Sequence, residues 1–129
     1  TAFVQYACAK AVSDIGNTVT AISEMTTEYE RRRDWLIPAL REVEGFRCSD
    51  PDGAFYAFVD VRSMLGNKYA SSADIADALL KERQIVVTDG AGFGADGYLR
   101  ISYATSMDCL NRAVDRMKSL FNSAAGSAA

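Results

Sequence analysis

Histidine is absent from this chain of 129 residues, and cysteine occurs only three times, at Cys8, Cys48 and Cys109. No two cysteines have the CxxC spacing, so a Cys/His zinc site and a Cys/His nucleophile pair are both excluded within this chain. Three cysteines are also an odd number for a disulfide framework. We expect them to be small buried apolar residues of a protein in the reducing cytoplasm, and we expect no metal site.

Long apolar runs and strongly basic runs are lacking as well. No stretch approaches the roughly 18 apolar residues that span a bilayer, and no signal peptide is recognisable. The formal net charge is −3, and the basic run at residues 31–33 is surrounded by acidic residues. We therefore expect neither a membrane nor a nucleic acid as partner. The length predicts one domain, and because the sequence begins without methionine we expect it to be a piece of a longer protein.

Apolar periodicity and turn signals predict a small α+β domain. Apolar residues at helical spacing predict helices, and short aromatic or β-branched runs bounded by glycine predict strands. We expect helices at residues 3–12 (buried), 17–45, 71–82 and 106–121, and strands at residues 54–61, 85–87 and 98–104. Pro38 should bend the long helix, because it lacks an N–H group. This order of elements favours a two-layer fold, in which a small, mainly antiparallel sheet carries helices packed mostly on one face.

Arg100 is the residue that most strongly suggests chemistry. It lies in the middle of the strand-like run 98–104, just after the glycine-rich turn 90–94. A guanidinium group presents a planar fork of N–H donors, which binds a carboxylate through two parallel hydrogen bonds. Spacing alone favours the other interpretation, an arginine on the solvated face of a strand, because arginine is mostly exposed in proteins.

Several motifs, which follow one another along the chain, help to decide between these two interpretations of Arg100. They are Gly53-Ala54-Phe55-Tyr56, Val87-Thr88-Asp89-Gly90 continuing to Phe93-Gly94, and the run Leu99–Ser106, with support from the segments around Gln5 and at residues 29–34. Together they resemble the C-terminal part of fold-type I, class I/II pyridoxal-phosphate aminotransferases, and aspartate aminotransferase with its bacterial relatives is the nearest match. The likeness extends from about Phe3 to Phe121. It implies an aminotransferase small domain at residues 1–121, with a long N-terminal interdomain helix, and a flexible tail at residues 122–129.

The resemblance also implies roles for individual residues. Arg100 would hold the α-carboxylate of the substrate. Phe55 would lie near the substrate, although a place in the core of a buried strand is equally compatible with its sequence. Gly90 and Gly94 would shape the turn before the arginine strand rather than touch a ligand. Asp89 departs from the proline of the family pattern. We expect it to be a solvated loop acid, since in the cleft it would oppose a dicarboxylate substrate.

The catalytic apparatus of such an enzyme is missing from this sequence. The family's Schiff-base lysine lies in a Ser-x-x-Lys-like segment of the large domain, and Lys10, Lys68, Lys81 and Lys118 all lack that context. The resemblance therefore implies no catalytic and no cofactor-binding residue here. It implies pyridoxal 5'-phosphate only in a parent enzyme, a homodimer with a large domain that moves an amino group from an amino acid to a 2-oxo acid. The isolated chain would be inactive.

Three alternatives stay open. A lyase or synthase of the same fold, acting at Cβ or Cγ, shares the carboxylate-binding arginine. Aminotransferase-like domains also serve as effector-binding parts of bacterial transcription regulators, in which Arg100 would sense a ligand without turnover. A stand-alone binding or scaffolding module is the third.

Overall fold

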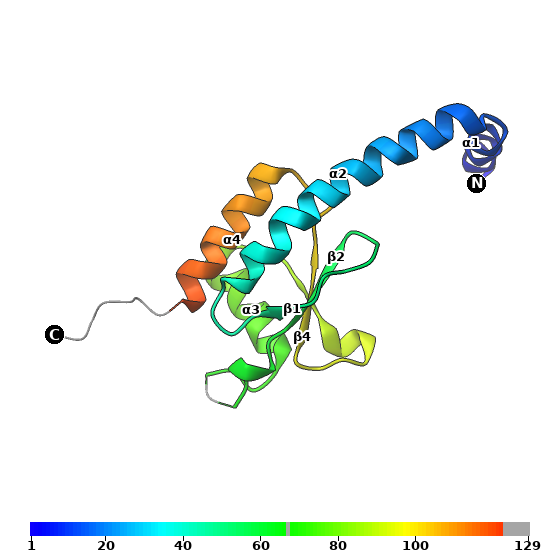
Figure 1. Cartoon of the computed structure of the whole chain (residues 1–129). Helices are drawn as coiled ribbons and strands as arrows, with labels where there is room; N and C mark the ends of the chain where they lie inside the picture. Colours follow the sequence, from blue (N-terminus) through cyan, green and yellow to red (C-terminus); the bar gives the residue numbers. More distant parts are fainter. Residues whose placement is uncertain (67, 123–129) are drawn as a thin grey trace. The chain divides into compact units, whose positions relative to one another are not determined.

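The computed structural model describes residues 1–66 and 68–122. Within it, two compact units can be separated, Thr1–Arg31 and Arg32–Ala129. The elements are α1 (Ala2–Ser13), α2 (Ile15–Arg41), β1 (Arg47–Cys48), β2 (Tyr56–Asp60), α3 (Ser72–Arg83), β3 (Thr88–Asp89), β4 (Tyr98–Ser102) and α4 (Met107–Phe121), with short 3₁₀ turns at Arg62–Met64 and Gly90–Phe93 (Figure 1). Of the predicted tail, Asn122 binds the main chain of Glu42 and Glu44, and the rest lies outside the described residues.

The first unit contains α1 and the beginning of α2, which are separated by Asp14 alone. The gap expected between the helices at residues 3–12 and 17–45 is shorter than predicted, because α2 begins directly after Asp14. Its main-chain carbonyl accepts the first hydrogen bond of α2, from Thr18 N, and its carboxylate accepts one from Asn17 Nδ2 at 3.0 Å.

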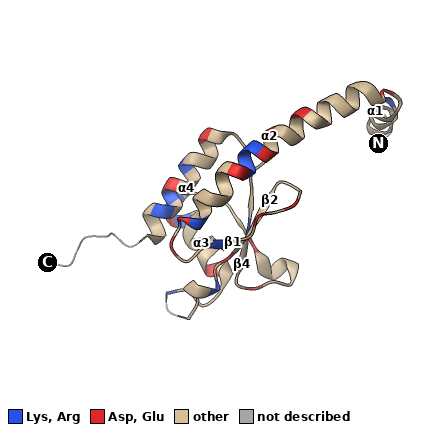
Figure 2. Cartoon of the chain, in the orientation of Figure 1, with Lys and Arg blue, Asp and Glu red and all other residues tan. Residues whose placement is uncertain are grey.

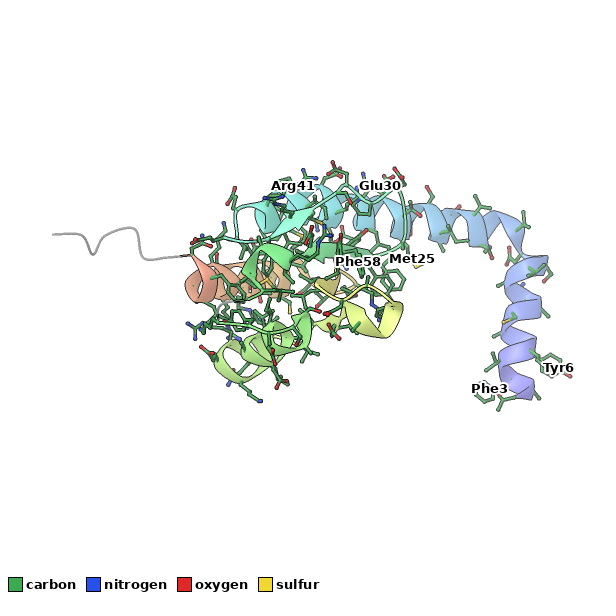
Figure 3. All side chains as sticks on the ribbon, turned by 90° about the horizontal axis from the view of Figure 1, so that it is seen from below. Phe3, Tyr6, Met25, Glu30, Arg41 and Phe58 are labelled. Atoms are coloured by element: carbon green, nitrogen blue, oxygen red, sulfur yellow. The ribbon has the colours of Figure 1, made fainter. Side chains whose placement is uncertain are left out.

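The first helix forms as predicted, but the expectation that it is buried is wrong. None of the twelve residues of α1 is buried, and Phe3 and Tyr6 project from it with more than three-quarters of their surface exposed (Figure 3). Its apolar residues do not keep to one side, so α1 has no single stripe to bury.

The sheet belongs to the second unit, and all its pairings are antiparallel. The strand order is β1-β2-β4-β3. In the central pair, Phe58 lies opposite Arg100 and Val59 lies opposite Leu99. The small antiparallel α+β architecture is thus confirmed.

One face of this sheet forms the core. Ala57 and Val59 on β2, and Leu99 and Ile101 on β4, are buried, and they alternate with residues that are not. α3 contacts β3 and β4. The helices supply most of the remaining core, with Leu36, Ile37, Leu40, Ile75, Leu79, Leu110, Val114 and Met117. The helices therefore cover mainly one face, as expected, and the other face is left open.

Helix starts were predicted more accurately than short strands. Ser71 and Asp74 form a capping box at α3, and Ser106 caps α4 by accepting from Cys109 N, so the helices expected from residues 71 and 106 begin where predicted. The strand expected at residues 85–87 is wrong, since pairing begins only at Thr88. The two-residue strand β1 was not predicted. α2 continues through Pro38 and ends at Arg41, short of the predicted end at residue 45.

The cysteines are not the buried residues that we expected. Cys8 and Cys109 are exposed, and Cys48 is half-buried. Burial nevertheless raises the pKa of the Cys48 thiol. Among the described helices, none is both long and apolar enough to cross a membrane. Acidic and basic residues are interleaved along α4 and the end of α2 (Figure 2).

Candidate functional site

The open face of the sheet carries Arg100. Side chains alternate between the two faces of a strand, and on β4 the buried Leu99 and Ile101 flank Arg100 on either side. Arg100 pairs with Phe58 of β2 on one side and with Thr88 of β3 on the other. The sequence thus places a half-buried guanidinium in the middle of the uncovered face.

Two aromatic rings contact this guanidinium. Its central carbon, Cζ, lies 4.5 Å from the ring centre of Tyr56 and 4.2 Å from that of Phe93. Within the described part of the chain, Arg100 forms no hydrogen bond or ion pair through its side chain. Contact with a ring face leaves the N–H donors, which lie in the plane of the group, available for an anion.

Phe55 directly precedes β2 and connects to this cluster through Tyr56. The centres of the two rings are 4.4 Å apart, and Phe55 is 37% exposed. The alternative role of Phe55 as a core residue is therefore wrong. Tyr103 fastens this stretch, because its main-chain N–H donates to Phe55 O at 2.9 Å and its hydroxyl donates to Ala54 O at 3.0 Å. Burial raises the pKa of that hydroxyl.

Sequence reasoning missed the two residues that contact Arg100. Tyr56 could have been found, because it occupies the same face as Phe58 two residues along β2, diagonal to Arg100. Phe93 carries no comparable signal. It reaches Arg100 only through the path of the β3–β4 loop, which strand alternation does not encode.

A second group extends along the same face. Phe58 stacks on Tyr98 with ring centres 5.0 Å apart, and the Arg62 guanidinium lies 5.1 Å from the centre of the Tyr98 ring. Arg62 is already engaged by Asp60, through Nε at 3.0 Å and Nη2 at 2.7 Å. These hydrogen bonds lower the pKa of Asp60. Arg62 therefore differs from Arg100, which has no carboxylate beside it in the described residues.

The glycine-rich turn has the structural role that we expected. A Cβ atom on Gly90 would clash with Ala95 O and would lie 2.7 Å from Tyr98 O, so only glycine fits there. Gly94 adopts a φ of 75°, in the left-handed region. The expectation that Asp89 is a solvated loop acid is wrong. Asp89 is half-buried, and its carboxylate accepts a hydrogen bond from the buried hydroxyl of Ser72.

A model of the aminotransferase class I and II family matches residues 1–117. The chain belongs to this family. Its likeness to aspartate aminotransferase of Streptomyces avermitilis is 34% identity over 119 residues, which cover 88% of the chain and 29% of that protein. Aromatic-amino-acid aminotransferase 2 of Thermococcus litoralis is 41% identical over 118 residues, with 90% and 29% coverage. The chain thus spans less than a third of the length of these aminotransferases.

Solved aminotransferase structures have the same fold. The aromatic aminotransferase of Pyrococcus horikoshii OT3 superposes with a TM-score of 0.81 at 39% identity, covering 92% of this chain and 30% of the other. The aspartate aminotransferase of Thermus thermophilus with maleate gives a TM-score of 0.71 at 34% identity, covering 84% and 27%. The likeness therefore holds for both sequence and structure.

Aminotransferases of this family use pyridoxal 5'-phosphate, and the lysines of this chain do not fit its attachment. Lys10 pairs with Asp14, Lys81 with Asp77 and Lys118 with Glu42, and Lys68 lies over the ring of Tyr69. These contacts raise the pKa of Lys68, chiefly through Tyr69, and of Lys81, chiefly through Asp77. A nucleophilic lysine needs the opposite shift, toward the neutral amine. No group of three potential metal ligands occurs among the described residues.

Proposed function

We propose that this chain is the C-terminal small domain of a pyridoxal-phosphate aminotransferase of the aspartate aminotransferase type, and that Arg100 binds the α-carboxylate of the substrate. The observation that carries the proposal is the state of the Arg100 guanidinium. It lies on the open face of the sheet, two rings contact it, and no carboxylate neutralises it in the described residues. An arginine that only stabilised the fold would be expected to have an anionic or carbonyl partner, as Arg62 has.

The proposed role is orientation. Binding of the carboxylate in two parallel hydrogen bonds fixes the direction of the α-carbon. Tyr56 and Phe93 restrict the guanidinium beforehand, so less side-chain entropy is lost on binding. Phe55 bounds the same region and would exclude water from the carboxylate. The cofactor would supply the electron sink for the chemistry, and its ligands would come from outside this chain, in a large domain of a cytoplasmic homodimer.

The kinetic test replaces Arg100 with lysine in the enzyme that includes the cofactor-binding part. Lysine keeps the charge but loses the planar pair of donors. We expect kcat/KM for the amino acid to fall about 10- to 100-fold, the value of about one charge-assisted hydrogen bond. Arg112→Lys is the matched control, since Arg112 lies on α4 in an exposed pair with Asp108. Equal kinetics for the two variants would rule out the proposed role.

The same enzyme separates the alternatives. A transaminase requires a 2-oxo acid as amino acceptor, whereas a lyase of the same fold releases its product without one. The coding sequence upstream of Thr1 provides the second discriminator. We expect it to encode the Schiff-base lysine segment, and a winged-helix segment there would favour a transcription regulator.

A further inference from the structure

A buried serine connects both ends of the loop that carries Phe93. Ser72 is the first residue of α3, and its exposed fraction is 0%. Its Oγ atom lies 2.5 Å from Asp89 Oδ1 and 2.8 Å from Asp96 Oδ1. The same Oγ accepts a hydrogen bond from the main-chain N–H of Gly97 at 3.0 Å. Asp89 precedes the loop at residues 90–97, while Asp96 and Gly97 end it, so one hydroxyl group contacts both sides.

Two donors, the Ser72 hydroxyl and the Gly97 N–H group, are available for the two carboxylates of Asp89 and Asp96. A hydroxyl has one proton and two acceptor sites, so Ser72 can donate to only one carboxylate at a time. The Gly97 N–H also donates to Asp96, at 2.8 Å, and the second carboxylate is thereby served. Removal of the Ser72 hydroxyl would leave Asp89 without this donor in a half-buried position, and it would release Gly97 from α3.

Phe93 depends on this loop for its position. It is 52% exposed, so burial in the core does not hold its ring over Arg100. The main chain of the loop does so, through Ala95 N donating to Gly90 O and Gly94 N donating to Ala91 O, each at 3.0 Å. The ends of that loop are in turn joined to α3 by Ser72.

We propose that Ser72 is a positioning residue for Arg100, because it fastens the loop whose Phe93 ring holds the guanidinium on the open face. The catalytic meaning of this inference rests on the proposed function, but its geometric content does not. Among the described residues, the hydrogen bonds of Ser72 go to Asp89, Asp96 and Gly97 rather than to Arg100 or Phe93, so Ser72 would act through the path of residues 89–97.

The first arm of the test is spectroscopic and uses the 129-residue chain. A guanidinium beneath an aromatic ring gives Arg100 side-chain proton resonances that are displaced by the ring current. Phe93→Leu measures the part of this displacement that comes from Phe93. We expect Ser72→Ala to move the Arg100 resonances toward their Phe93→Leu positions. Ser71→Ala is the matched control, because it removes the cap of α3 but leaves the contacts of Asp89, Asp96 and Gly97 intact.

The second arm measures kinetics in the enzyme with its cofactor-binding part. We expect Ser72→Ala to raise KM for the amino acid about 2- to 30-fold, with a smaller change in kcat, whereas Ser71→Ala leaves KM unchanged. If Ser72→Ala does not fold, Ser72→Cys keeps the side-chain volume and weakens the hydrogen bonds, and it replaces alanine in both arms.

Three outcomes are informative. Movement of the Arg100 resonances together with a higher KM in Ser72→Ala supports the inference. Wild-type resonances in Ser72→Ala overturn it, even if Arg100→Lys confirms the carboxylate role. Displaced resonances with an unchanged KM overturn the catalytic meaning of the inference, and the separate Arg100→Lys result then decides whether the proposed function fails with it.

Discussion

The ring contacts that hold the Arg100 guanidinium are weaker than the hydrogen bonds that it can form with a carboxylate. A cation–ring contact at a partly exposed site contributes about 0.5–1 kcal/mol. A hydrogen bond to a charged group contributes about 1.5–3 kcal/mol. Tyr56 and Phe93, at 4.5 and 4.2 Å, can therefore restrict the guanidinium without competing with a carboxylate for its donors. An ion pair of the Asp60–Arg62 kind would have competed directly.

The Asp60–Arg62 pair provides a prediction about pH. Arg62 lowers the pKa of Asp60 in the folded chain, so the folded state favours the ionised carboxylate. The resulting stability is fully present above the unfolded pKa, about 4, and is lost as the pH falls through the folded pKa. We expect the difference in unfolding free energy between wild type and Asp60→Asn to shrink between pH 7 and pH 2. Urea unfolding measures it, with Asp115→Asn on α4 as control, and a constant difference would contradict the prediction.

At the scale of elements, the β3–β4 loop shows why some glycines are required and others are not. A Cβ atom added to Gly90 would come within 2.7 Å of the carbonyl oxygens of Ala95 and Tyr98, whereas one added to Gly92 would meet nothing within 4 Å. The two glycines are two residues apart in one 3₁₀ turn, Gly90–Phe93. They therefore form a natural pair for comparison.

Gly90→Ala should destabilise the chain by about 1–3 kcal/mol, the usual cost of overpacking, and it should displace the turn that carries Phe93. Gly92→Ala should leave stability unchanged or raise it by about 0.4–1 kcal/mol, because alanine restricts the unfolded chain. Chemical denaturation measures both values. Equal effects of the two substitutions would show that the close approach at Gly90 is absent in solution.

The elements also show what the sequence could and could not predict. α4 was predictable, because Ser106 and the apolar spacing from Leu110 onward agree. The composition of residues 85–87 favours a strand, but the first of them, Ile85, is hydrogen-bonded to the C-terminal end of α3. Gln84 adopts a left-handed φ of 56°, and Ile85 N donates to Leu79 O at 3.0 Å, a closing bond of the helix terminus. Strand pairing can begin only after this connection.

The candidate site was predictable to a similar degree. The place of Arg100 in a strand follows from residues 98–104 alone, and its proposed role came from the resemblance. Its contact with Phe93 could not be predicted, because that contact depends on Ser72, which belongs to a separate helix earlier in the sequence. Such long-range polar connections leave no periodic pattern in a sequence.

On the scale of the whole molecule, the exposed apolar side chains of α1 stand out. Phe3 is 76% exposed and Tyr6 is 78% exposed (Figure 3). Val4 and Ala7 of the same helix are exposed as well, and we call these four residues the apolar N-terminal patch. A patch of this kind usually marks a contact surface. The chain spans about 29% of the aminotransferases it resembles, and we expect the patch to contact a large domain in the parent enzyme.

The isolated chain should therefore self-associate through the N-terminal patch. We expect sedimentation velocity to show species larger than the monomer at high protein concentration. The double substitution Phe3→Ser and Tyr6→Ser should restore the monomer, because it replaces the two largest apolar side chains. Val86→Ser is the control, since Val86 is 83% exposed but lies in the other unit. A wild-type chain that stays monomeric would contradict the prediction.

The alternation of side chains along β4 links the packing of the core, through Leu99 and Ile101, to the outward position of Arg100. If one residue were deleted between Gly97 and Arg100, Leu99 would turn outward and the guanidinium would turn into the apolar layer. Such a deletion would disrupt the core and the proposed carboxylate-binding site together. A length change in the loop before Gly97 would displace Phe93 but would leave the alternation of β4, and with it the core, unchanged.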